Sequence, residues 1–175
     1  MASDGIRVGR RFIKSKMDHY GLVCKAAKRY KATTNSKHYL PVAPNLLEQN
    51  FVVSAPNKVW VSDFTYLWTL QGWMYLAIVL DLYSRRIVGW SMSNRMTKEL
   101  VIEALEMAIR QRKPDAGLIV HSDRGSQYCS REYQKTIKRY HLCCSMSKKG
   151  DCYDNACAET FFHSFKVEWI HFPYP

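Results

Sequence analysis

The amino-acid sequence predicts an α/β domain: a mixed five-stranded sheet flanked by helices, with a short basic helical extension before it. Three observations lead to this prediction. From about residue 51 onward, aromatic and β-branched residues dominate short segments of strand length. Segments with apolar residues at helical spacing then alternate with further short apolar runs. The resulting order, β-β-β-α-β-α-β-α, is typical of a sheet with helices packed on its faces.

The first three strands are expected at residues 58–70, 72–84 and 85–93. The first, KVWVSDFTYLWTL, is rich in aromatic and β-branched residues. The second, GWMYLAIVLDLYS, is almost continuously apolar, as a strand buried on both faces would be. The segments between the three strands are short, so we expect an antiparallel meander.

The remaining elements alternate between helix and strand. Residues 97–113 carry apolar side chains at helical spacing, and Thr97 is the expected N-cap. A strand at 117–123, a helix at 130–142, a strand at 143–147 and a helix from about residue 155 follow. In the strand order that we favour, the first and fourth strands are neighbours.

The first 50 residues form a separate basic region in this interpretation, and the core occupies residues 51–175. Residues 1–50 hold ten Lys or Arg and three acids, a net charge of +7 of the chain's +11. Within them, VGRRFIKSKMDHYG (8–21) predicts a short amphipathic helix that ends at Gly21, and residues 28–45 are expected to be a linker. A single helix of this length cannot bury its own apolar face, so it needs a neighbouring element, or it is a remnant of a larger DNA-binding unit.

Composition points to a polyanionic partner. The chain has 26 Lys and Arg against 15 Asp and Glu, which favours nucleic acid, although a basic protein without such a partner is the plainer alternative. The longest apolar run, near residues 73–80, is far shorter than the ~20 residues of a membrane helix. No hydrophobic signal core follows the first methionine. We therefore expect a cytoplasmic protein with no membrane partner.

Three acids fall where catalytic groups are usually placed. Asp63 lies inside the apolar first strand, Asp123 ends the fourth strand, and Glu159 lies near the start of the last helix. Adjacent first and fourth strands would bring these carboxylates together, and hard oxygen ligands suit Mg²⁺ or Mn²⁺. Each acid also has a plainer reading: an Asp63 ion pair, an Asx turn at Asp123, or a first-turn helix acid at Glu159.

Two basic groups follow Glu159 on the same helical face. His163 is four positions later and Lys166 is seven positions later, one and two turns along the helix. We expect Lys166 to contact phosphate, and a solvated stripe of charge is the alternative.

A zinc site is the competing metal interpretation. Cys152, Cys157 and His163 are close in sequence, but they form no C-x-x-C pair and no matching His pair. The six cysteines show no regular spacing and are expected to be free thiols.

The acids and their surroundings match a known pattern. Thirty-five residues separate Asp123 from Glu159, and the blocks WVSDFTYL, HSDRGSQYCS and SKKGDCYDNACAETFFHSFKVE surround the three acids in order. Over about residues 6–170 the chain resembles the OrfB-type transposase of the bacterial insertion-sequence-three group, with its retroviral-integrase-like DDE core.

The resemblance implies a ribonuclease-H-like fold and Mg²⁺-dependent cleavage of a donor DNA strand, followed by transfer of the freed 3′-OH to target DNA. Asp63, Asp123 and Glu159 would be the catalytic acids and would hold two Mg²⁺ or Mn²⁺ ions. A homo-oligomer on DNA is implied as well. The candidate DNA contacts are Lys166, His163, Arg124, Lys148, Lys149, Arg10 and Arg11.

The resemblance also has departures. Relative to the family pattern, the chain is expected to be truncated at both ends. Its three acids, Asp63, Asp123 and Glu159, are intact, and whether the chain is active is left open at this point. Two alternatives are kept: a metal-dependent nuclease of the same fold, and a non-catalytic DNA-binding remnant that interferes with a full-length transposase.

Overall fold

The computed structural model describes residues 9–22, 39–148 and 155–170. The chain divides into two compact units, residues 1–33 and residues 34–175. In the first unit, helix α1 (Arg10–His19) has no buried side chain, and Phe12 and Ile13 are exposed. Its end at Gly21, which has a positive φ of 63°, agrees with the predicted stop.

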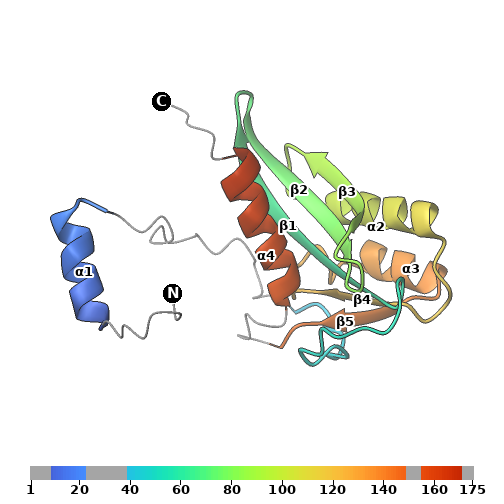
Figure 1. The fold of residues 1–175 in the computed structure, drawn as a ribbon. Coiled ribbons are helices and arrows are strands. Elements are labelled where there is room, and N and C mark those ends of the chain that lie inside the picture. The colour runs from blue at the N-terminus through green and yellow to red at the C-terminus, as the bar shows by residue number, and fades with distance from the viewer. Residues whose placement is uncertain (1–8, 23–38, 149–154, 171–175) are drawn as a thin grey trace. The chain divides into compact units, whose positions relative to one another are not determined.

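The second unit is built on a five-stranded sheet of order β3-β2-β1-β4-β5. The strands are β1 (Val59–Thr69), β2 (Gly72–Asp81), β3 (Ile87–Ser93), β4 (Ile119–Ser122) and β5 (Cys143–Met146). The first three form the predicted antiparallel meander, and β4 and β5 join it in parallel (Figure 1). The expected adjacency of the first and fourth strands is confirmed.

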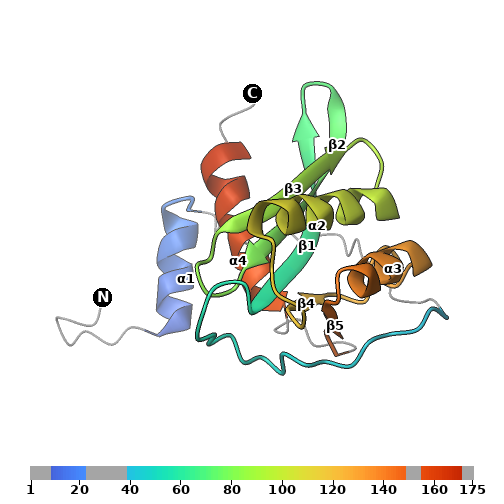
Figure 2. The same cartoon turned by 90° about the vertical axis from the view of Figure 1, so that its right-hand side faces the viewer.

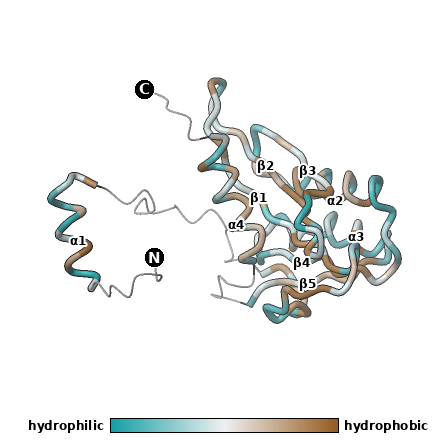
Figure 3. The backbone as a smooth tube through the Cα atoms, viewed as in Figure 1, coloured by the Kyte–Doolittle hydropathy of each residue, from teal (hydrophilic) through white to brown (hydrophobic). Residues whose placement is uncertain are grey.

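Helices cover both faces of the sheet, as Figures 1 and 2 show. On one face α2 (Lys98–Arg112) and α3 (Arg131–Arg139) pack with Trp60 and Phe64 of β1. On the other face α4 (Ala156–Phe165) packs with Val61 and Leu67, and the π-helical turn η3 (Lys166–Ile170) continues it. Successive β1 residues therefore serve two separate apolar clusters. Figure 3 shows hydrophobic positions along the sheet and hydrophilic ones on the outer turns of α2 and α3.

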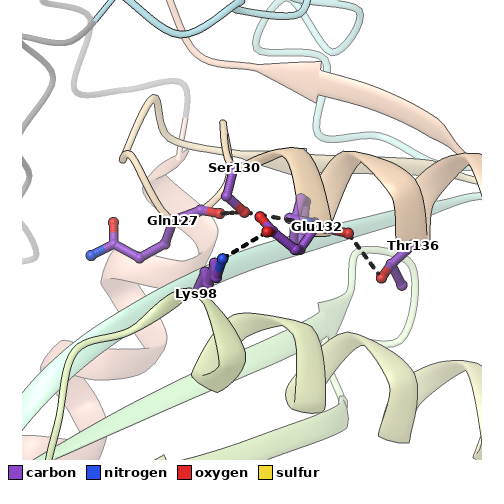
Figure 4. Close-up of polar contacts among 6 residues, drawn as sticks. Lys98, Gln127, Ser130, Glu132 and Thr136 are labelled. Atoms are coloured by element: carbon purple, nitrogen blue, oxygen red, sulfur yellow. Dashed lines mark hydrogen bonds and ion pairs between the residues drawn. The ribbon is translucent and has the colours of Figure 1, made fainter.

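The two helices on the first face are joined at their N-terminal ends. The Nζ of Lys98 lies 2.8 Å from Oε1 of Glu132 (Figure 4), and both side chains are substantially exposed. Ser130 caps α3, since its hydroxyl accepts a hydrogen bond from the Tyr133 N–H at 3.2 Å. Thr97 occupies the N-cap position of α2 as predicted, but its side chain makes no capping bond. Because both groups of the Lys98–Glu132 pair are exposed, the pair contributes little to stability.

The described part of the predicted linker is packed against the sheet. The Met146 N–H donates to the Pro44 carbonyl at 3.2 Å, and the Leu46 N–H donates to Ser145 Oγ at 2.8 Å. Leu47 is buried beside Val61. Residues 43–47 thus line β5, which ends the sheet, instead of spanning a gap. A polar, proline-containing sequence gives no indication of packing of this kind. The expected domain boundary near residue 50 stays a prediction.

Among the described helices, none is long and apolar enough to cross a membrane.

Gly89 on β3 permits the close approach of α2. A Cβ at this position would lie 2.2 Å from the Ala104 carbonyl oxygen and 2.7 Å from the Ala108 backbone nitrogen. Both are backbone atoms, so relief requires the helix to move. We expect Gly89→Ala to lower the free energy of unfolding by about 1–3 kcal/mol, measured by urea denaturation. Gly9→Ala is the matched control, because no atom lies within 4 Å of its added Cβ. Equal stability of the two variants would contradict the close-packing account.

Candidate active site

Asp63 lies in the middle of β1, between β2 and β4. Its partner across β2 is Ile78, which packs with Phe162 of α4. Because paired residues on neighbouring strands point to the same face, Asp63 lies on the face that α4 covers. One carboxylate oxygen accepts a hydrogen bond from the Phe64 N–H at 2.8 Å. No ion pair joins Asp63 to an arginine among the described residues, so the alternative of a structural Asp–Arg pair has no support.

Asp123 follows directly after β4. The parallel register pairs Val61 with His121, so Asp63 and Asp123 each lie two residues beyond this pair. The Asp123 Oδ1 accepts a hydrogen bond from the Gly125 N–H at 2.8 Å. The Asx-type turn that was the plainer alternative is therefore present. The same turn fixes the orientation of the carboxylate, and the two interpretations do not exclude each other.

Glu159 comes from α4, which crosses the sheet face that carries Asp63. Ala158 and Phe162 are buried and attach the helix to two separate apolar clusters. Glu159 itself is exposed, and partial burial of its carboxyl group raises its pKa. The carboxylate thus stands at the rim of the site, on a helix whose neighbouring residues are anchored.

The electrostatics of Asp63 show which groups lie close to it. Burial raises the pKa of Asp63 well above its ordinary value, and the charges of Asp123 and Glu159 raise it further. The Phe64 N–H and the charge of Lys166 act in the opposite direction. The structure therefore brings the three acids and Lys166 into one electrostatic neighbourhood.

The acids do not form a closed metal cage. Among the described residues, no group of three or more Asp, Glu, His or Cys side chains is arranged to hold a metal ion. Two carboxylates 4 Å apart repel by about 4 kcal/mol at an effective dielectric of 20. An open arrangement is the lower-energy one for the three acids alone. The same finding gives no support to the zinc alternative, although Cys152 lies outside the described residues.

Lys166 approaches the site from the end of α4. Its ammonium lies 4.7 Å from the ring centroid of Tyr66 on β1, a cation–π distance. Burial lowers the pKa of Lys166, and the Asp63 charge opposes that effect. By contrast, the side chain of His163 is exposed on α4.

The remaining candidate DNA contacts are distributed unevenly. Arg124 donates from Nε to the carbonyl oxygen of Ser147, which joins the loop after β4 to the end of β5. Lys148 is exposed beside this contact. Lys149 lies outside the described residues. Arg10 and Arg11 are exposed on α1, in the first unit.

Two buried polar groups support the loop that carries Asp123, and sequence reasoning did not identify them. His121 is fully buried, with Nδ1 2.9 Å from Ser145 Oγ and Nε2 3.3 Å from Ser147 Oγ. The Tyr128 hydroxyl lies 3.2 Å from Ser62 Oγ. Burial and the charges of the two aspartates raise the Tyr128 pKa. Polar residues in a strand of four could have been noticed, but their partners are distant in sequence.

The four described cysteines (Cys129, Cys143, Cys144 and Cys157) are free thiols, as expected. Cys157 and the buried Ala158 pack at the start of α4, in the cluster of Val61 and Leu82.

Comparison with known proteins agrees with this geometry. The family model described as "Integrase core domain" matches residues 53–152, more than half of the chain. Transposase InsF for insertion sequence IS3A of Escherichia coli K12 is 53% identical over 159 residues, which are 91% of this chain and 55% of that protein. An insertion element IS600 31 kDa protein of Shigella sonnei is 51% identical over 168 residues, 96% of this chain and 62% of that one. The chain thus spans little more than half the length of these curated relatives.

Solved structures show the same fold at low sequence identity. A chain of the simian T-cell lymphotropic virus intasome, in complex with a PP2A regulatory subunit, matches with a TM-score of 0.57 and 16% identity, over 95% of this chain and 60% of that one. The HTLV-2 integrase catalytic core domain in complex with magnesium matches with a TM-score of 0.51 and 20% identity, over 67% and 77%. These matches confirm the ribonuclease-H-like fold.

The family match, the transposase relatives and the fold agree with one another, and the resemblance to insertion-sequence-three transposases is confirmed. The chain belongs to the integrase core domain family, a family of DDE polynucleotidyl transferases.

Proposed function

We propose that this chain is the catalytic core of an insertion-sequence transposase, which cleaves a donor DNA strand and joins its 3′-OH to target DNA. The observation that carries the proposal is the coupling of Asp63 to both Asp123 and Glu159. Three carboxylates from three different elements have converged on one face of the sheet, although their mutual repulsion destabilises the chain. A cost of that kind is expected where a site serves chemistry.

The donor set fits divalent cations. All three groups offer hard carboxylate oxygens, which suit Mg²⁺ or Mn²⁺ and not the softer metals. Burial and the charges of Asp123 and Glu159 raise the pKa of Asp63, so a bound cation would favour its ionised form. We propose that Asp63, Asp123 and Glu159 hold two such ions. Bound there, the ions would polarise the phosphodiester and activate the attacking hydroxyl.

The chain's own residues orient the reaction. The Gly125 N–H holds the Asp123 carboxylate, and the Phe64 N–H holds that of Asp63, so neither is free to rotate. Lys166, close enough to influence the Asp63 charge, would neutralise a phosphate of the DNA strand beside the acids. Water or a DNA 3′-OH is the nucleophile in this proposal, and no covalent enzyme intermediate is required.

DNA is the proposed partner, at both the transposon end and the target. The net charge of +11 supports a phosphate-binding surface. We propose that Arg10, Arg11, Arg124 and the two lysines at 148 and 149 contribute phosphate contacts. Joining two ends requires at least two copies on DNA. Action on chromosomal DNA implies a location at the bacterial nucleoid.

A strand-transfer assay tests the catalytic proposal. Labelled oligonucleotides with matching transposon ends are incubated with the protein and Mg²⁺, and joined products are resolved by gel electrophoresis. We expect Asp123→Asn to reduce joining at least about a hundredfold, because it removes several kcal/mol of transition-state stabilisation. Asp115→Asn, an exposed loop aspartate, is the matched control and should retain activity. Metal-independent joining, or equal activity of the two variants, would contradict the proposal. Cleavage of RNA–DNA hybrids in place of joining would favour a nuclease.

The pH dependence of stability tests whether the acids meet. The folded pKa of Asp63 lies above its unfolded value of ~3.9. Between these two values the folded chain binds more protons, so stability falls as pH rises. We expect Asp63→Asn to raise the melting temperature at pH 7 without divalent metal, and the gain to shrink toward pH 4.

Added Mg²⁺ gives the complementary result. It should raise the melting temperature of the unaltered chain and have a much smaller effect on Asp63→Asn, since ligands that bind the folded state stabilise it. Asp115→Asn should follow the unaltered chain in both experiments. A metal effect that is identical in all three proteins would show that Asp63 is not a ligand.

A further inference from the structure

Three aromatic side chains near the end of the β1–β2 hairpin form a continuous row, named here the aromatic ladder. It consists of Tyr66 and Trp68 on β1 and Trp73 on β2. The ring centroids of Tyr66 and Trp73 are 5.2 Å apart, and those of Trp73 and Trp68 are 4.9 Å apart. The register pairs Trp68 with Trp73 across the two strands. Trp73 therefore links the other two rings.

The ladder is exposed to an unusual degree. Trp68 is 56% exposed and Trp73 is 53% exposed, and Leu70 at the turn is 86% exposed. Figures 1 and 2 show the end of the hairpin extending past α2. Contiguous exposed apolar side chains of this size mark a binding surface more often than they mark ordinary surface.

One end of the ladder meets the active site. The Lys166 ammonium lies 4.7 Å from the Tyr66 ring and is also within electrostatic reach of Asp63. By the alternation of β1, Asp63 projects from one face of the sheet and Tyr66 and Trp68 project from the other. Lys166 lies near both Asp63 and Tyr66, so a strand running from the acids to the tryptophans would pass round the side of β1 beyond the end of β4. From Asp63 to Trp68 is five strand residues, about 17 Å. Roughly five nucleotides of one DNA strand cover the same length.

We propose that the aromatic ladder binds unpaired bases of the DNA strand that lies in the active site, and the proposal rests on the proposed function. The ring planes of the ladder are inclined by 68° and 67°. The rings therefore meet edge to face and do not stack on one another, so each such contact covers at most one face of one ring. Base–aromatic stacking tolerates any sequence, and Lys166 supplies the phosphate contact that such sites combine with it.

A second copy of the chain is the competing occupant of the same surface. Bases are favoured because the ladder ends at a cation beside the catalytic acids. A chain with a net charge of +11 also repels its own copies, whereas it attracts DNA. The test below separates the two occupants.

The experiment measures DNA binding without divalent metal, so that cleavage does not interfere. Fluorescence anisotropy compares a fully paired oligonucleotide duplex with the same duplex carrying a five-nucleotide unpaired 3′ extension. The unaltered chain should bind the extended DNA more tightly. The double change Trp68→Ala with Trp73→Ala should weaken binding of the extended DNA about tenfold or more and leave binding of the paired duplex unchanged.

Two controls make the result specific. Trp90→Ala removes a tryptophan of similar exposure, 50%, from β3 of the same sheet, and should change neither affinity. The double change Trp68→Phe with Trp73→Phe keeps aromatic rings and should restore most of the preference. Restoration by phenylalanine excludes misfolding of the hairpin as the cause.

The outcomes that overturn the inference are distinct from failure of the proposed function. The inference is overturned if the double tryptophan variant binds both DNAs equally more weakly, or if it binds both like the unaltered chain. It is also overturned if the variant keeps its DNA binding but loses self-association in a sedimentation experiment. If strand transfer fails but the unpaired preference depends on the ladder, only the catalytic proposal falls. If strand transfer succeeds and the ladder variants bind like the unaltered chain, only the ladder proposal falls.

Discussion

The parallel pairing of β1 with β4 is the constraint on which the rest of the site depends. It sets Val61 level with His121 and so carries Asp63 and Asp123 to the same height on neighbouring strands. β4 is only four residues long, and the polypeptide turns away immediately after it. β1 continues to Thr69 without a partner on that side. The end of β4 therefore opens a place beside β1 for the Asp123 turn and for residues from α4.

The surrounding packing keeps this arrangement in place against its own electrostatics. Trp60 and Phe64 attach one face of β1 to the cluster under α2, and Val61 and Leu67 attach the other face to the clusters under α4. Asp63 lies between these packed residues. Burial and the nearby charges of Asp123 and Glu159 make its ionised form less favourable.

Sequence patterns predicted the strands and helices of the sheet domain well because hydrophobic periodicity records burial, and each of these elements buries one side against the sheet or a helix. The β1–β4 adjacency, and with it the meeting of Asp63 with Asp123, followed from element order. The structural features that the sequence could not predict depend on contacts between residues far apart in the chain. The close approach at Gly89, the packing of residues 43–47 on β5 and the His121 hydrogen bonds are of this kind.

The packing of residues 43–47 along β5 has a consequence for how the sheet meets other molecules. A terminal strand with unpaired N–H and C=O groups is a template on which another chain can add a strand. Here the Met146 N–H is already bonded to the Pro44 carbonyl, and proline offers no N–H through which pairing could continue outward. The sheet is thus closed to β-type addition at this position.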